Sequence, residues 1–199
     1  IWMELIQEYR PDVLESFRRL VDTGAVELTG ETYHHSLSWL HSRPEFVRQV
    51  EAHRLKTKAL FGVIPRVFRH TELIYENELA REVRLLGYDG ILCEGMERHL
   101  KGRSPNFTYA APGNGDFGLL LRHVRLSDDI SFRFDDPHWN EQPLTAEKFA
   151  RWIHQHDDSD CCNINLFMDY ETFGVHKSPE SGILDFLDHL PGNILSEPA

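Results

Sequence analysis

The stretch from Ser42 to Arg69, SRPEFVRQVEAHRLKTKALFGVIPRVFR, contains one full copy of the pattern that decides the fold. Ser42 and Glu45 have capping-box spacing, which predicts the start of a helix. Gly62 predicts the end of this helix, because glycine easily adopts the left-handed backbone that closes a helix. The apolar residues that follow predict a strand over 66–69. The order is therefore helix, glycine, strand.

The same order occurs on both sides of this stretch. A helix that begins at Pro11 is expected to end at Gly24, before a strand at 25–29. A helix over about 76–86 is expected to end at Gly87, before a strand at 90–93. Such alternation is typical of a parallel sheet covered by helices. We therefore expect an α/β fold, a parallel-strand partial (β/α) barrel, in a single domain over residues 1–199.

The second half of the chain does not continue the regular order of helix, glycine and strand. Four glycines and two prolines predict an irregular loop over 101–118. Beyond it we expect the following elements, in chain order: a strand at 119–126, a helix capped by Thr145, a strand at 163–168 and a closing helix at 183–190.

Composition excludes several classes of protein. The formal net charge of −11 disfavours nucleic acid and anionic lipid as partners. No apolar run approaches the ~18 residues of a membrane span, and the amino terminus lacks the order of a secretion signal. Cys93 stands alone and Cys161 is next to Cys162, which forms neither a disulfide framework nor a CxxC metal site. We expect reduced thiols and a cytoplasmic protein.

Two of the expected strands lead directly into acidic residues. Glu72 follows the strand at 66–69, and Asp169 and Glu171 follow the strand at 163–168. Strand ends carry the chemistry of parallel α/β folds, and glycoside hydrolysis needs two carboxylates. Glu72 and Asp169 are thus the predicted catalytic pair, and Glu171 is a candidate for binding a sugar hydroxyl. An alternative interpretation, that these acids are solvated loop residues, stays open.

The segment Leu28-Thr29-Gly30-Glu31-Thr32-Tyr33-His34-His35-Ser36 also follows an expected strand. It combines an acid, an aromatic ring and histidines, a mixture that suits sugar binding. Glu31, Tyr33 and His35 are therefore candidate substrate-binding residues. The sequence has no HExxH or HxxxH pattern, so no metal or other cofactor is predicted.

At these positions the chain resembles glycoside hydrolase family 57, in particular its α-amylase-like members. The resembling stretches are Gly30-Glu31-Thr32-Tyr33-His34-His35-Ser36-Leu37, Phe68-Arg69-His70-Thr71-Glu72-Leu73-Ile74-Tyr75, Leu126-Ser127-Asp128-Asp129-Ile130 and Phe167-Met168-Asp169-Tyr170-Glu171-Thr172-Phe173-Gly174. The family's first motif, His-Gln-Pro, has no counterpart, so the resemblance implies a seven-stranded barrel that lacks its first strands and the helical region beyond it.

The resemblance implies a retaining reaction on α-glucans, as in amylases, branching enzymes or glucanotransferases. It makes Glu72 the nucleophile and Asp169 the general acid/base. It places Glu31 and His35 in the substrate groove, and the stretch that ends at Tyr75 makes this ring a further substrate contact. The implied ligand is an α-glucan or maltooligosaccharide, and a second copy or a missing segment could complete the barrel.

Two other functions remain open at this stage. One is a relative without catalysis that binds glucan or assembles with another chain. The other is a metal-dependent polysaccharide deacetylase on a related barrel, against which the missing HxxxH pattern argues.

Overall fold

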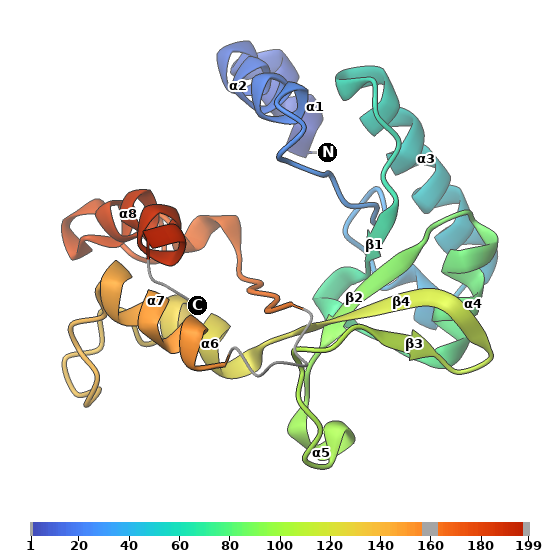
Figure 1. Ribbon diagram of the computed structural model, residues 1–199. Helices are drawn as coiled ribbons and strands as arrows, with labels where there is room; N and C mark the ends of the chain where they lie inside the picture. Colours follow the sequence, from blue (N-terminus) through green and yellow to red (C-terminus); the bar gives the residue numbers. More distant parts are fainter. Residues whose placement is uncertain (1, 157–162, 197–199) are drawn as a thin grey trace. The chain divides into compact units, whose positions relative to one another are not determined.

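The computed structural model describes residues 2–156 and 163–196, and its helices and strands follow one another along the chain as Figure 1 shows. The chain divides into two compact units. Unit 1 consists of Ile1–Cys93 and Tyr109–Leu120, and unit 2 of Glu94–Thr108 and Leu121–Ala199. Cys161 and Cys162 lie outside the described residues.

The elements of unit 1, in chain order, are α1 (Trp2–Tyr9), α2 (Pro11–Asp22), the 3-10 helix η1 (Ser38–Leu40), α3 (Arg43–Phe61), β1 (Val67–Arg69), the 3-10 helix η2 (Thr71–Leu73), α4 (Asn77–Leu85), β2 (Gly90–Glu94), β3 (Tyr109–Ala111) and β4 (Asn114–Arg122). The last residues of β2 and β4 belong to unit 2. The elements of unit 2 are α5 (Glu97–Leu100), α6 (Val124–Ser131), α7 (Ala146–Gln155), the 3-10 helices η3 (Tyr170–Thr172) and η4 (Pro179–Ser181), and α8 (Ile183–Ser196).

The strands form a sheet in the order β1-β2-β4-β3. The neighbours β1 and β2 are parallel, with Phe68 opposite Ile91, whereas β3 and β4 form an antiparallel hairpin. Helix α4 lies beside the sheet (Figure 1), and its buried face consists of Leu79, Ala80 and Val83. Such parallel pairing positions the ends of β1 and β2 side by side.

The helix ends agree with the signals in the sequence. The hydroxyl of Ser42 accepts a hydrogen bond from the Glu45 amide at 3.4 Å, and Gly62 closes α3 with φ 74°. The Thr145 hydroxyl accepts one from the Lys148 amide at 3.2 Å at the start of α7. A cap of this kind contributes about 1 kcal/mol, because it satisfies an amide that has no partner within the helix.

Three predictions about extended segments are wrong. Residues 25–29 form no strand, since their side chains are mostly exposed and only Gly30 pairs, in a parallel bridge to Phe68. Residues 163–168 likewise make a single bridge, from Asn165 to Arg122. The strand expected at 119–126 ends at Arg122, because the His123 ring accepts a hydrogen bond from the Leu126 amide at 3.2 Å and begins α6.

The loop predicted over 101–118 is also wrong in its second part. Residues 109–118 contain β3 and most of β4, and the tight turn between them has Gly113 at φ 74°. The glycines in this segment indicated an irregular loop, but one of them, Gly113, supplies the left-handed residue of a hairpin turn.

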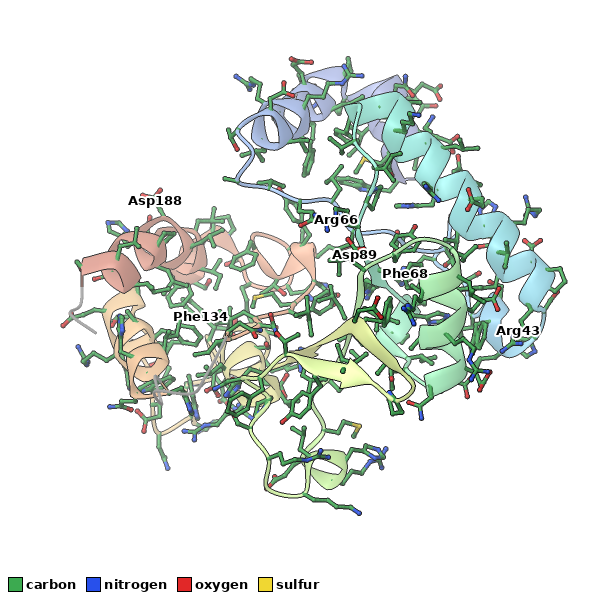
Figure 2. The ribbon with its side chains drawn as sticks, turned by 45° about the vertical axis from the view of Figure 1, so that its right-hand side comes forward. Arg43, Arg66, Phe68, Asp89, Phe134 and Asp188 are labelled. Carbon is green, nitrogen blue, oxygen red and sulfur yellow. The ribbon has the colours of Figure 1, made fainter. Side chains whose placement is uncertain are left out.

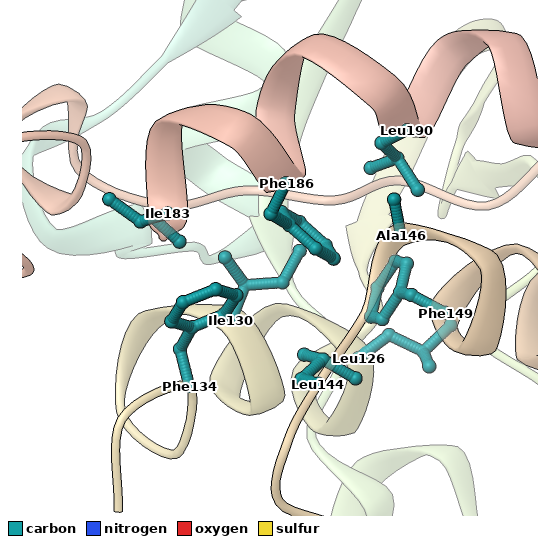
Figure 3. Packing of buried hydrophobic residues seen from close by; sticks show 9 residues of the cluster. All are labelled: Leu126, Ile130, Phe134, Leu144, Ala146, Phe149, Ile183, Phe186 and Leu190. Atoms are coloured by element: carbon teal, nitrogen blue, oxygen red, sulfur yellow. The ribbon is translucent and has the colours of Figure 1, made fainter. Parts of the chain in front are cut away.

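Each unit has its own apolar core. In unit 1 the rings of Phe46, Phe68 and Tyr88 pack edge to face, with centroids 5.8 Å and 5.3 Å apart. Figure 2 labels Phe68 in this core and Phe134 in that of unit 2. The core of unit 2 joins α6, α7 and α8, whose buried side chains point toward one another in Figure 3. Each large side chain buried in this way contributes roughly 2 kcal/mol.

None of the helices among the described residues is long and apolar enough to span a membrane.

Candidate active site

Glu72 lies at the end of β1 on a turn with an uncommon backbone. Its φ is 57° and that of Leu73 is 51°, so two successive residues with side chains adopt the left-handed conformation. Each costs about 1–2 kcal/mol relative to an ordinary conformation. The buried side chains of Thr71 and Leu73 anchor the turn on either side, while the Glu72 side chain is 73% exposed. The turn therefore presents a carboxylate outward from a fixed base.

Three further ionisable side chains form a connected group with Glu72, which it joins through His35. The His35 Nε2 atom lies 3.8 Å from Glu72 Oε1, and His35 Nδ1 lies 3.4 Å from Glu31 Oε2. Arg69, the last residue of β1, has its Nη1 atom 3.2 Å from His35 Nδ1 and 3.6 Å from Glu31 Oε2. Unit 1 thus gathers three of the candidate site residues, Glu31, His35 and Glu72, and adds Arg69.

The segment that carries Glu31 and His35 is firmly held. Gly30 donates its amide to the Val67 carbonyl and accepts from the Arg69 amide, both at 2.8 Å, which extends the parallel pairing of β1. The buried Thr32 hydroxyl accepts a hydrogen bond from the Ser36 amide at 2.8 Å. A Cβ atom on Gly30 would lie 2.4 Å from the Tyr88 ring, so a larger residue at this position would displace that ring.

His70 lies behind the Glu72 turn and is completely buried. Its Nδ1 atom is 2.9 Å from the Thr71 carbonyl, and its ring stacks on Phe46 with centroids 5.8 Å apart. Since only a protonated nitrogen can donate to a carbonyl, Nδ1 carries the ring proton. Burial lowers the pKa of His70, because the apolar surroundings disfavour an imidazolium.

The two tyrosines predicted to bind substrate each have a partner elsewhere in unit 1. Tyr33 donates its hydroxyl to Glu4 Oε1 at 2.6 Å, which raises the pKa of this phenol and lowers that of the carboxyl. Tyr75 donates to Asn77 Oδ1 at 3.1 Å, and burial raises the pKa of Tyr75 to about 12. Their contact with a substrate stays a prediction.

In unit 2, Asp169 and Glu171 are exposed at the start of η3. The carbonyl of Asp169 accepts a hydrogen bond from the Thr172 amide at 3.0 Å, and that of Glu171 accepts from the His176 amide at 2.8 Å. Their carboxylates face outward, while the buried Thr172 anchors the turn. Glu72 belongs to unit 1 and Asp169 to unit 2, so the predicted proximity of these two carboxylates stays a prediction.

Side chains hold the segment before Asp169, where the sequence predicted a strand. The Phe167 amide donates to the buried Ser127 hydroxyl at 3.1 Å, and the Phe167 carbonyl accepts from Arg122 Nε at 2.8 Å. The Asn165 side-chain amide donates to the Leu121 carbonyl at 3.0 Å, and the Asn165 main-chain carbonyl accepts from the His123 amide at 2.8 Å. These bonds replace the ladder of a regular strand.

Arg122 is the centre of this arrangement. Its side chain is 10% exposed and pairs with Asp128 at 2.6 Å and with Glu94 at 3.3 Å. A Cβ atom on Gly95 would lie 2.2 Å from the Arg122 carbonyl oxygen, so the chain after β2 passes this residue in close contact. The sequence patterns did not single out Arg69 or Arg122, because these patterns concern acids, histidines and aromatic rings that follow strands. Each is the last residue of its strand, and this position was the available signal.

The described residues contain no group of three or more His, Cys, Asp or Glu side chains with the arrangement of a metal site. The cluster of Glu31, His35 and Glu72 includes the cation Arg69, which would repel a metal ion. This geometry gives no support to a metal-dependent deacetylase.

Comparisons with known proteins identify close relatives. The model of glycosyl hydrolase family 57 matches residues 2–198. A protein of Methanocaldococcus jannaschii that bears the name "Putative alpha-amylase" is 46% identical over 192 residues. The match covers 96% of this chain and 40% of the relative, so the chain spans less than half the length of that protein.

Solved structures show the same fold at lower identity. The 4-alpha-glucanotransferase from Thermococcus litoralis superposes with a TM-score of 0.75 at 20% identity, over 94% of this chain and 29% of the other. A family 57 branching enzyme from Thermococcus kodakaraensis gives 0.61 at 16% identity, over 97% and 48% of the two chains. The α/β fold class predicted from the sequence, a partial (β/α) barrel, is thereby confirmed.

Proposed function

The chain belongs to glycosyl hydrolase family 57, and on that premise we propose that it acts on α-glucans as a retaining glycoside hydrolase or transglycosidase. In this proposal Glu72 is the nucleophile and Asp169 the general acid/base. Support comes from the relative named for an amylase and from the fold shared with a glucanotransferase and a branching enzyme.

The observation that carries the proposal is the Glu72 turn. Backbone strain persists only where the surrounding structure maintains it, and it is concentrated at active sites. Here the left-handed turn carries an exposed carboxylate that lies 3.8 Å from His35, which in turn contacts Glu31, just beyond the carboxyl end of a parallel strand. A structural acid would need neither the left-handed turn nor the flanking cluster.

The reaction proceeds in two steps. Glu72 attacks the anomeric carbon of a bound α-glucosyl unit, while Asp169 donates its proton to the departing glycosidic oxygen. The result is a glycosyl ester on Glu72. Asp169, now a carboxylate, then removes a proton from water or from a sugar hydroxyl, which attacks the ester and restores Glu72. Water gives hydrolysis and a sugar gives transfer. The two carboxyl groups should lie about 5–5.5 Å apart, as retaining enzymes require.

Glu31, His35 and Glu171 have supporting roles in this proposal. Carboxylate and imidazole groups can bind the hydroxyls of a sugar, and Glu31 and His35 lie within contact of each other beside the nucleophile. Tyr33 and Tyr75 are proposed as rings at the edge of the substrate site. A single catalytic domain in a cytoplasmic protein is part of the same proposal.

Incubation of the purified protein with maltooligosaccharides tests the proposal. Glu72→Gln preserves the shape of the side chain but removes its charge, so turnover should fall by roughly 10⁴-fold or more. Glu78→Gln is the matched control, because Glu78 is also exposed in unit 1 and pairs with the surface residues Arg43 and Arg81. Binding of maltooligosaccharide without turnover by the unsubstituted protein would instead indicate the glucan-binding alternative.

A further inference from the structure

The Arg69–His35–Glu72 chain of contacts carries an inference about proton positions. An arginine guanidinium has only N–H donors and no acceptor, and it stays charged at any working pH. The 3.2 Å contact between Arg69 Nη1 and His35 Nδ1 is therefore a hydrogen bond only if Nδ1 has a free lone pair. In a neutral imidazole the proton then lies on Nε2.

The opposite side of the ring agrees with this assignment. His35 Nε2 faces Glu72 Oε1 at 3.8 Å, so a proton on Nε2 points toward a carboxylate. The other neutral tautomer would place an Nδ1–H against the N–H of Arg69 and a lone pair of Nε2 against the Glu72 oxygen, and both contacts would be repulsive. It would gain only the 3.4 Å contact from Nδ1 to Glu31.

The doubly protonated ring has a similar conflict. An imidazolium would be attracted to Glu31 and Glu72 but would lie 3.2 Å from the guanidinium nitrogen. Arg69 is 15% exposed, so water screens its charge less than that of a surface arginine. The neutral ring with its proton on Nε2 satisfies Arg69 and Glu72 together.

The backbone holds both partners in place. Arg69 ends β1, and its amide donates to the Gly30 carbonyl at 2.8 Å. His35 has φ 52°, and its amide donates to the Thr32 carbonyl at 3.0 Å. The direction of the imidazole is therefore set by main-chain geometry on one side and by the guanidinium on the other.

We propose that Arg69 is a positioning residue, which fixes the tautomer of His35 so that the neutral ring presents its Nε2–H to the carboxylate of Glu72. This inference rests on the proposed role of Glu72 as nucleophile. A neutral donor orients the carboxylate for attack and leaves its charge available, whereas an imidazolium at the same place would neutralise it. The contact of 3.8 Å is longer than a hydrogen bond, and catalytic contacts are often long in the absence of substrate.

The test is a long-range ¹H–¹⁵N spectrum of the histidine-labelled protein at about pH 8, where an ordinary imidazole is neutral. His35→Gln assigns the signals of residue 35. The expected wild-type pattern is a protonated Nε2 and an unprotonated Nδ1. In Arg69→Met the Nδ1–H form should appear, since Glu31 is then the nearest partner of Nδ1.

Arg69→Lys keeps a donor and a positive charge, so it should retain most of the Nε2–H form. If Arg69→Met folds poorly, Arg69→Lys still tests whether a cationic donor at this position maintains the tautomer of His35. The control Arg66→Met removes an exposed arginine just before the same strand, labelled beside its partner Asp89 in Figure 2, and should leave the spectrum unchanged. A wild-type His35 with its proton on Nδ1, or an Arg69→Met protein that keeps the Nε2–H form, overturns the proposal.

Kinetics provide the second readout. Arg69→Met should lower kcat on maltooligosaccharides by about 10- to 100-fold, with a much smaller change in KM, because a misdirected nucleophile affects the chemical step. An unchanged kcat overturns the positioning role. If wild-type His35 lacks the Nε2–H signal but turnover still depends on Glu72, the tautomer proposal is wrong and the proposed function stands. If wild-type His35 has the Nε2–H signal but the protein shows no turnover, only the proposed function is contradicted.

Discussion

Glu72 in unit 1 and Asp169 in unit 2 both follow extended segments, but different forces hold these segments. Before Glu72, main-chain hydrogen bonds join β1 to β2 and to Gly30, and a left-handed turn completes the approach. Before Asp169, the chain makes one bridge, and the side chains of Arg122 and Ser127 bind both main-chain polar groups of Phe167. Main-chain pairing tolerates a change of side chain, whereas a clamp made of side chains does not. The two carboxylates should therefore respond differently to substitution.

The largest effect is expected from Arg122→Met. The substitution leaves the Glu94 and Asp128 carboxylates, both partly buried, without their cation and frees the Phe167 carbonyl. Loss of one partner of a buried ion pair costs about 3–5 kcal/mol, which urea unfolding should detect as a lower free energy of unfolding. Arg125→Met, at an exposed site of α6, is the control. Equal stability of the two variants would contradict the proposed role of Arg122 in holding the segment before Asp169.

Alanine at two glycines tests how closely each segment is packed. In Gly95→Ala the new methyl would lie 2.2 Å from a main-chain oxygen of Arg122, and in Gly30→Ala 2.4 Å from the side chain of Tyr88. Because a main-chain atom moves less easily than a ring, Gly95→Ala should cost about 3 kcal/mol and Gly30→Ala about 1–2 kcal/mol. Gly115→Ala meets no atom within 4 Å and serves as reference. A larger loss of unfolding free energy in Gly30→Ala than in Gly95→Ala would contradict the expectation that the segment at Gly95 is the more tightly packed of the two.

Each unit also contains a buried histidine that makes its stability depend on pH. Burial lowers the pKa of His70 in unit 1, and burial followed by the nearby His156 lowers that of His123 in unit 2. Below about pH 6.5 the unfolded chain takes up a proton at each site before the folded protein does. The free energy of unfolding should therefore fall as the pH drops below this value. Above this value, the protein should keep the full stability that depends on the two neutral histidines.

Urea unfolding at several pH values checks this dependence in the wild type and in His70→Phe and His123→Phe. Each substitution should remove part of the slope. The exposed His138 provides the control, His138→Gln. A slope that stays the same in both phenylalanine variants would show that other groups cause the acid sensitivity.

The smallest effects are expected at the helix caps, which lie away from both carboxylates. Ser42→Ala in unit 1 and Thr145→Ala in unit 2 each remove one hydrogen bond to a helix amide and should cost about 1 kcal/mol. Aspartate at either position retains an accepting oxygen and should restore stability. The kcat on maltooligosaccharides should not change. A large loss of kcat in either alanine variant would mean that stability, and not positioning, limits activity.

Local signals in the sequence predicted the helix ends well. Ser42, Gly62 and Thr145 act through hydrogen bonds and backbone angles within a few residues, so the pattern itself contains the cause. The segments 25–29 and 163–168 were predicted as strands from their apolar residues, but strand pairing depends on distant partners. Helices α1 and α6 were not predicted, and α6 begins at a histidine cap, His123, which is not among the usual capping residues.

The candidate site was predicted in part. The structure brings the candidate residues Glu31, His35 and Glu72 together in unit 1, but Glu31 and His35 follow a segment that forms no strand, and their role in a substrate site stays a prediction. The arginines that organise the two sites were missed. Their role depends on which groups a long side chain reaches, and spacing along the chain does not encode this. The hydrogen bond of Tyr33 was missed for the same reason, since its partner Glu4 belongs to α1, a helix that was not predicted.

The identity of the residue that forms the covalent intermediate tests the central claim most directly. An activated fluoro sugar of the α-glucosyl series forms a long-lived ester with a retaining nucleophile, and Asp169→Asn would slow its hydrolysis further. Digestion and mass spectrometry of the treated protein should find the added sugar on the peptide that contains Glu72, attached to its carboxylate. A sugar on another residue, or rapid turnover with no covalent adduct, would contradict the account.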